Sequence, residues 1–156
     1  MCASILIVTH WMHVPFLRLC LKSIAKHAHG FERVVIVAPT TEVGLFEKEF
    51  GGSQTAAGKP IIFRHCWEVV NRGHIQMNGT KMCADLYLPE ADLIAHLDAD
   101  CVLTRKVTPE SYLVDNRILV LARPYAIAGD ARAWKPLVDR ALGIDATLET
   151  MQSSQI

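Results

Sequence analysis

The chain has 156 residues, of which 51% are hydrophobic and 21% are charged, and this composition is typical of one globular domain. Its 16 basic and 16 acidic residues cancel, and the basic residues form no run in the sequence, so we expect no nucleic-acid partner. The apolar runs are all shorter than the ~20 residues that a membrane-spanning helix needs, and we predict no such segment.

The first half of the chain alternates between predicted strands and helices. The apolar run Ile5–Val8 predicts a strand buried on both faces, and a helix should follow from Pro15 to near Gly30. Val34–Ala38 predicts a second buried strand, and Glu42–Phe50 a second helix. A polar loop over Ser53–Pro60 then leads to a short third strand, Ile61–Arg64.

The second half continues the pattern. Ile75–Leu88 predicts one helix, although Gly79 weakens it, and Leu93–Leu97 predicts a strand that runs directly into Asp98-Ala-Asp100. Ile118–Leu121 predicts a last strand and Trp134–Leu142 a last helix. We therefore expect an α/β fold, a three-layer sandwich around a mostly parallel sheet, over the single domain 1–156. Ile5–Val8, Val34–Val37 and Leu93–Leu97 should be adjacent strands in the interior of that sheet.

Polar and aromatic residues follow several of the predicted strands. In parallel sheets ligands bind beyond the carboxyl ends of the strands, where this chain carries Thr9-His10-Trp11 and Asp98-Ala-Asp100. Side chains two positions apart in an extended segment face the same way, so both carboxylates can meet one cation. Mg²⁺ and Mn²⁺ prefer oxygen ligands, and the motif predicts a site for one of them at Asp98 and Asp100.

The segment Ala91-Asp-Leu-Ile-Ala-His-Leu-Asp-Ala-Asp-Cys-Val-Leu resembles the strand and DxD motif of GT-A glycosyltransferases. The opening strand, Ser4-Ile-Leu-Ile-Val-Thr-His, is similar to their donor-binding first strand, and Gly73–Asp85 is similar to the helix beside their donor. The resemblance covers about residues 4–125 and is specific at the DxD strand. It implies transfer of a sugar from a nucleoside diphosphate to an acceptor hydroxyl with the help of Mn²⁺ or Mg²⁺.

Carried over to this sequence, the resemblance implies that Asp100 binds the metal and that Asp98 contacts the metal or the ribose. It places Thr9 and His10 at the nucleoside and Lys81 at the diphosphate or ribose of a UDP- or GDP-linked donor. Trp11 is a candidate to stack on the base. The segment after Asp100 is short for this family. We therefore expect the acceptor portion, a third metal ligand and the catalytic base to be missing, and the sequence assigns no catalytic residue and no glycan, lipid or protein acceptor.

Simpler interpretations stand beside these. Lys81 and Asp85 are four residues apart on a predicted helix, so an ordinary ion pair accounts for both. Other polar candidates have weaker support, namely His13, Trp67, Arg72, His74 and Asp130.

Two other functions compete with sugar transfer. A non-catalytic nucleotide-binding module is the first alternative, and a haloacid-dehalogenase-like phosphatase, which also uses DxD, is the second. Five cysteines without CxxC spacing indicate reduced thiols and a cytoplasmic protein.

Overall fold

Four parallel strands form the main sheet of the protein, in the order β3-β2-β1-β4. They are β1 (Ala3–Val8), β2 (Arg33–Ala38), β3 (Ile61–His65) and β4 (Leu93–His96). The computed structural model describes residues 1–51, 58–66, 74–119, 136, 139–140 and 143. The chain divides into two compact units, Met1–Leu113 and Val114–Ile156, and the four strands lie in the first. The predicted α/β class with a mostly parallel sheet is confirmed.

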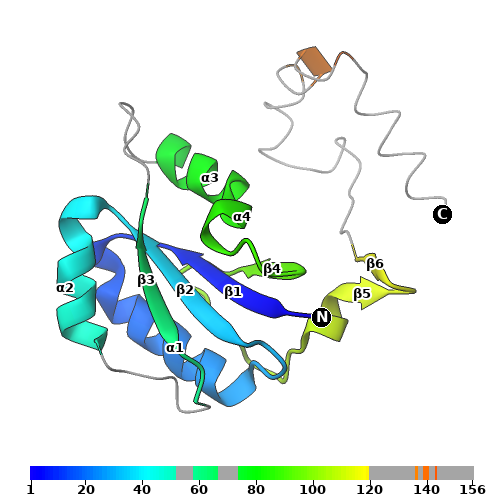
Figure 1. The fold of residues 1–156 in the computed structure, drawn as a ribbon, viewed down its shortest axis with the longest axis horizontal. Coiled ribbons are helices and arrows are strands. Elements are labelled where there is room, and N and C mark those ends of the chain that lie inside the picture. Colours follow the sequence, from blue (N-terminus) through cyan, green and yellow to red (C-terminus); the bar gives the residue numbers. More distant parts are fainter. Residues whose placement is uncertain (52–57, 67–73, 120–135, 137–138, 141–142, 144–156) are drawn as a thin grey trace. The chain divides into compact units, whose positions relative to one another are not determined.

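The helices of the first unit cover the sheet (Figure 1). A short 3₁₀ turn, Trp11–His13, leads into α1 (Val14–His27), and α2 (Thr40–Phe50) follows β2. Helices α3 (His74–Met82) and α4 (Ala84–Tyr87) precede β4. A second 3₁₀ turn, Pro109–Tyr112, comes after β4.

The sequence of β1 is apolar except for Ser4, because both faces of the strand are buried. Ile5 and Ile7 belong to one core cluster together with residues of α1 and α2. Leu6 and Val8, which point the other way, belong to a second cluster with Ala84 and Leu88. Burial on both faces is the usual reason for an unbroken aliphatic run in a parallel sheet.

The pairing of β1 with β2 and β4 agrees with the sequence prediction. Ile5 pairs with Val34 on one side and with Ala95 on the other, all in parallel. Within the described residues β4, like β3, is an edge strand of the sheet, and its residues are half-buried or exposed. The interior position of β4 in the sheet therefore stays a prediction.

The helix predicted over Ile75–Leu88 is two helices. The Cys83 N–H still donates to the Gly79 carbonyl four residues back, whereas the Leu86 N–H donates to the Cys83 carbonyl three residues back. The hydrogen-bond ladder thus tightens at Cys83, whose φ of −98° and ψ of 32° lie outside the helical range, and the helix is interrupted there.

The predicted strand Ile118–Leu121 is also different. Its described part contributes to β6 (Arg117–Ile118), which pairs with β5 (Leu113–Val114) in a sheet of two strands. Asp115 and Asn116 connect them with φ values of 50° and 60°, as a type I′ hairpin turn requires. Val120 and Leu121 lie outside the described residues, as does most of the helix predicted over Trp134–Leu142.

Candidate functional site

A tight turn follows β4 and carries the two aspartates. The Cys101 N–H donates to the Asp98 carbonyl at 3.0 Å, which closes the turn over Asp98–Cys101. Between the aspartates, the small side chain of Ala99 is buried in the same core cluster as α1. The turn therefore anchors its middle residue in the core and leaves both carboxylates exposed.

Two side chains of helix α1 support the turn, namely Cys20 and Ser23. The Cys20 thiol lies 3.8 Å from the Asp98 carbonyl oxygen. Burial, aided by nearby Cys101, Asp100 and Asp98, raises the pKa of Cys20 to about 12. The thiol therefore stays protonated and donates a hydrogen bond to the Asp98 carbonyl oxygen. One turn further along α1, the Ser23 hydroxyl accepts a hydrogen bond from the Leu103 N–H at 2.9 Å and donates to the Cys20 carbonyl at 2.7 Å.

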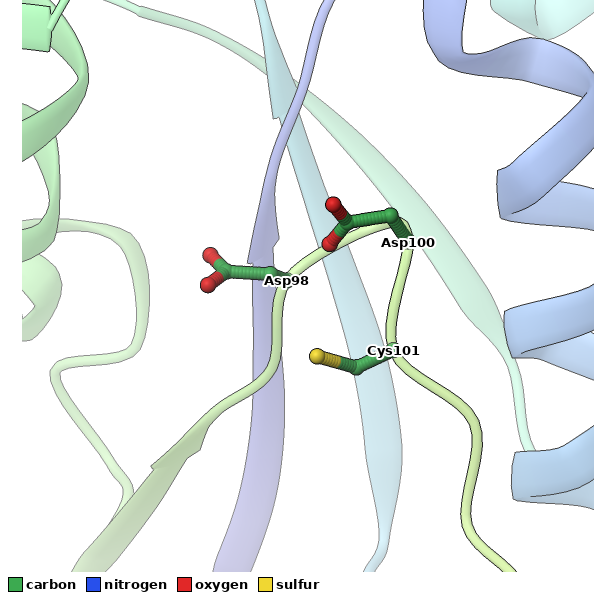
Figure 2. Close-up of side chains that lie close together, drawn as sticks. All are labelled: Asp98, Asp100 and Cys101. Atoms are coloured by element: carbon green, nitrogen blue, oxygen red, sulfur yellow. The ribbon is translucent and has the colours of Figure 1, made fainter.

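Three side chains of the turn can share one metal ion. The ligand atoms of Asp98, Asp100 and Cys101 all lie within 4.8 Å of one another, and the three residues are exposed. Figure 2 shows that their side chains leave the turn in the same direction. The two carboxylates suit a hard divalent cation such as Mn²⁺ or Mg²⁺, whereas the thiol suits a softer cation such as Zn²⁺.

Cys101 was missed by the sequence analysis. Its signal was its place directly after Asp100, but a thiol is a less usual ligand than a carboxylate for the hard cations that the motif suggests. Only the closed turn, in which Cys101 folds back toward Asp98, places the sulfur beside the carboxylates.

Lys81 lies against this cluster. Its ammonium is 2.5 Å from the Asp98 carboxylate, and the pair is partly open to solvent, with 24% of the Lys81 side chain and 54% of the Asp98 side chain exposed. The simpler interpretation, an ion pair between Lys81 and Asp85, is not what the structure shows. Lys81 lies in the last turn of α3 and Asp85 belongs to α4, so the break at Cys83 separates them.

His96, at the end of β4, stands close to the same charges. Its burial, followed by the neighbouring ammonium of Lys81, lowers the pKa of the imidazole, and Asp98 opposes this effect. The neutral form of His96 is therefore favoured next to Lys81.

A cavity of about 400 Å³ opens at the carboxyl ends of β1, β2 and β3. The described residues that line it come from these strand ends, from the turn after β1 and from α3: Val8, Thr9, His10, His13, Pro39, Cys66, Gln76 and Met77. Thr9 is held at the strand end by its own N–H, which donates to the Val37 carbonyl at 2.9 Å. The cavity thus has apolar walls with a few polar groups, as small-molecule sites usually do.

The histidines of the cavity lie together. The rings of His10 and His13 have centroids 3.9 Å apart. Burial, reinforced by His13, lowers the pKa of His10. The neutral imidazole of His10 that this favours offers one hydrogen-bond donor and one acceptor to a ligand.

The cavity and the aspartate turn both lie at the carboxyl ends of the parallel strands, which form one edge of the sheet. Because β1 and β4 are parallel neighbours, with Leu6 opposite His96, Thr9 and Asp98 leave the sheet at the same end. Helix α3 connects the two places, since Gln76 and Met77 line the cavity and Lys81, at its other end, pairs with Asp98. The expectation that the two segments share one edge is confirmed.

Trp11 is not among the cavity-lining residues. Its ring packs edge-on against Phe46 at 5.5 Å, and its backbone N–H donates to the Glu42 carboxylate at 2.7 Å. In this arrangement Trp11 fixes the turn after β1 to α2, and stacking on a base stays a prediction. Trp67, Arg72 and Asp130 lie outside the described residues.

Comparison with known proteins adds no relationship. No model of a known protein family matches the sequence, and no curated protein matches it. Within the described residues, no helix combines the length and the apolar character needed to cross a membrane.

Proposed function

We propose that this chain binds the nucleoside diphosphate of a sugar donor and acts as a glycosyltransferase of the GT-A type. The observation that carries the proposal is the place of the Asp98–Cys101 turn: it stands at the same sheet edge as the cavity, and α3 contributes residues to both. A nucleoside in the cavity and its diphosphate at the turn would fit this arrangement.

The fold supports the proposal in general terms. Core clusters on both faces of the sheet, one with α1 and α2 and the other with residues of α3 and α4, are compatible with the three-layer arrangement of that fold. The order β3-β2-β1-β4 places the strand before the DxD motif next to the first strand. Binding beyond the carboxyl ends of the strands is the general rule for such sheets.

In the proposed site each residue has a distinct task. Asp98, Asp100 and Cys101 would hold Mn²⁺ or Mg²⁺, which as a Lewis acid stabilises negative charge on a leaving diphosphate. Lys81 would move its ammonium from Asp98 to a phosphate oxygen. Thr9 and His10 would donate or accept hydrogen bonds at the nucleoside.

The test is the variant Asp100→Asn, which keeps the size of the side chain and removes one charge. We expect it to weaken UDP or GDP binding in Mn²⁺ by at least about tenfold, which corresponds to about 1.4 kcal/mol. Asp115→Asn is the matched control, because Asp115 stands in the β5–β6 turn and its positive φ is well tolerated by asparagine.

Two assays measure the result, namely calorimetric binding of UDP and GDP and release of the nucleoside diphosphate from UDP- and GDP-sugars. Binding without release in the intact chain would support the non-catalytic nucleotide-binding module instead. Release of inorganic phosphate from simple phosphate esters would support the phosphatase. Equal nucleotide binding by Asp100→Asn and the control would overturn the metal role of Asp100.

A further inference from the structure

The outer side of α1 exposes large apolar side chains. Met12, just before the helix, is 80% exposed, Phe16 is 52% exposed and Leu19 is 56% exposed. Their spacing of four and three residues places them in one stripe along the helix. The opposite side of α1 is apolar as well and is buried against the sheet through Leu17, Cys20, Leu21 and Ile24. A helix that only covered the sheet would need no second apolar side.

Positive charge continues the same stripe. Lys22 and Lys26 lie three and seven residues beyond Leu19, so they share its side of the helix, and both are exposed. No acidic residue occurs in α1. The polar side chains of this stripe are therefore all cationic, although the chain as a whole has a net charge of zero.

A second segment adds two cations beside the end of α1. The Val107 N–H donates to the His27 carbonyl and the His29 N–H donates to the Val107 carbonyl, each at 2.9 Å. The residues just before Val107 are Arg105 and Lys106, which are exposed. In the part of the chain that the structure describes, none of Lys22, Lys26, Arg105 and Lys106 forms an ion pair.

We propose that this surface, the α1 surface of Met12, Phe16, Leu19, Lys22 and Lys26, binds the face of an anionic phospholipid membrane. Apolar side chains on an amphipathic helix insert at the boundary between headgroups and acyl chains, while lysines contact the headgroup phosphates. The apolar side chains therefore match the acyl-chain boundary of such a membrane, and the lysines match its phosphate layer. Nucleic acid would leave the three apolar side chains without a partner.

A second copy of the chain fits the α1 surface less well. In a symmetric dimer the surface would face itself, and the lysines of one copy would approach those of the other. Like charges in contact oppose such an interface. An anionic bilayer neutralises the same lysines.

The location gives the surface a functional consequence. Met12 stands between His10 and His13, which both line the cavity. Membrane binding through α1 would therefore hold the cavity beside the bilayer. The inference does not depend on sugar transfer, since it rests on the outer side of α1 and on the cations of the adjacent segment before Val107.

The experiment is co-sedimentation of the intact chain with vesicles of phosphatidylcholine alone and of phosphatidylcholine mixed with phosphatidylglycerol. We expect binding to the anionic vesicles only, and weaker binding at high salt. The charge-reversed variant Lys22→Glu/Lys26→Glu and the polar variant Phe16→Ser/Leu19→Ser should each weaken binding by about tenfold or more. The controls, Lys48→Glu and Leu45→Ser, change exposed residues of α2 and should bind like the wild type.

Three results would overturn the proposal. The first is absence of binding to anionic vesicles or equal binding to both kinds of vesicle. The second is a self-associated wild type that becomes monomeric in Phe16→Ser/Leu19→Ser, which would make the surface an interface between copies. The third is binding to a polyanion such as heparin that loses strength only in Lys22→Glu/Lys26→Glu, without vesicle binding. Circular dichroism of each variant separates loss of binding from loss of folding.

Discussion

At the scale of single residues, Lys81 is the group whose role the structure changes most. Its ammonium contacts the same carboxylate that we propose as a metal ligand, so in the proposed site Lys81 and the metal would compete for Asp98. A phosphate that draws Lys81 away would free Asp98. Through this ion pair, nucleotide and metal would then assist each other's binding.

The variant Lys81→Gln tests this competition. Without nucleotide, we expect it to bind Mn²⁺ about two- to fivefold more tightly, because exposed ion pairs contribute up to about 1 kcal/mol. With Mn²⁺ present, it should bind UDP or GDP more weakly, because the phosphate loses a cation. Calorimetry measures both affinities, and Lys48→Gln, on α2, is the control. Weaker Mn²⁺ binding by Lys81→Gln in the absence of nucleotide would contradict the competition.

His10 makes the stability of the fold depend on pH. Burial and His13 hold the pKa of His10 below its ordinary value of 6.5, so the unfolded chain binds this proton more readily than the folded chain does. The free energy of unfolding should therefore fall as the pH drops from 6.5 toward the lowered pKa of the folded state, and this residue should contribute no slope at higher pH.

The measurement is urea denaturation at a series of pH values. His10→Asn should flatten the decline below pH 6.5, because it removes a group whose pKa differs between the two states. An unchanged slope in His10→Asn would show that other groups cause the decline.

At the scale of elements, α1 determines the shape of the aspartate turn. It contributes a buried thiol at the Asp98 carbonyl and a hydroxyl at the Leu103 N–H, while Ala99 packs into its core cluster. The carboxylates themselves are exposed, so the precision of the site comes from groups behind the turn. Supporting groups of this kind are commonly needed to hold ligands in place.

Ser23→Ala should therefore cost stability and loosen the turn. It leaves the Leu103 N–H without its acceptor, and such a loss destabilises a protein by about 1 kcal/mol. Urea denaturation measures the change, with Thr41→Ala, an exposed hydroxyl of α2, as the comparison. If Ser23→Ala unfolds at the same urea concentration as Thr41→Ala, the hydrogen bond does not support the turn.

Elements also show where sequence patterns were sufficient. The aliphatic runs of β1 and β2 predicted strands because no other element of that length buries two opposite faces. The break at Cys83 had no such signal. It arises from a change in backbone hydrogen bonding that leaves the apolar pattern of Ala84 and Leu88 intact.

At the scale of the whole molecule, the sequence indicated which strand ends would carry the candidate site but not what surrounds them. Parallel topology follows from alternation of strands and helices, and it places Thr9 and Asp98 at one edge. The partners of Lys81 and Trp11 depend on how helices pack across the sheet, and no local pattern records that. The surroundings of the α1 surface are not recorded by a local pattern either, because Arg105 comes beside it only through the pairing of Val107 with Ala28, just after α1.

The central claim is that metal and nucleoside diphosphate meet at Asp98 and Asp100. Calorimetric titration of the intact wild-type chain with UDP and with GDP, first in Mn²⁺ and then in EDTA, tests it most directly. We predict that one of the two nucleotides binds at least about tenfold more tightly in Mn²⁺, because the cation relieves the repulsion between carboxylates and diphosphate. Equal affinity in Mn²⁺ and EDTA for both nucleotides, or no binding of either, would contradict the account.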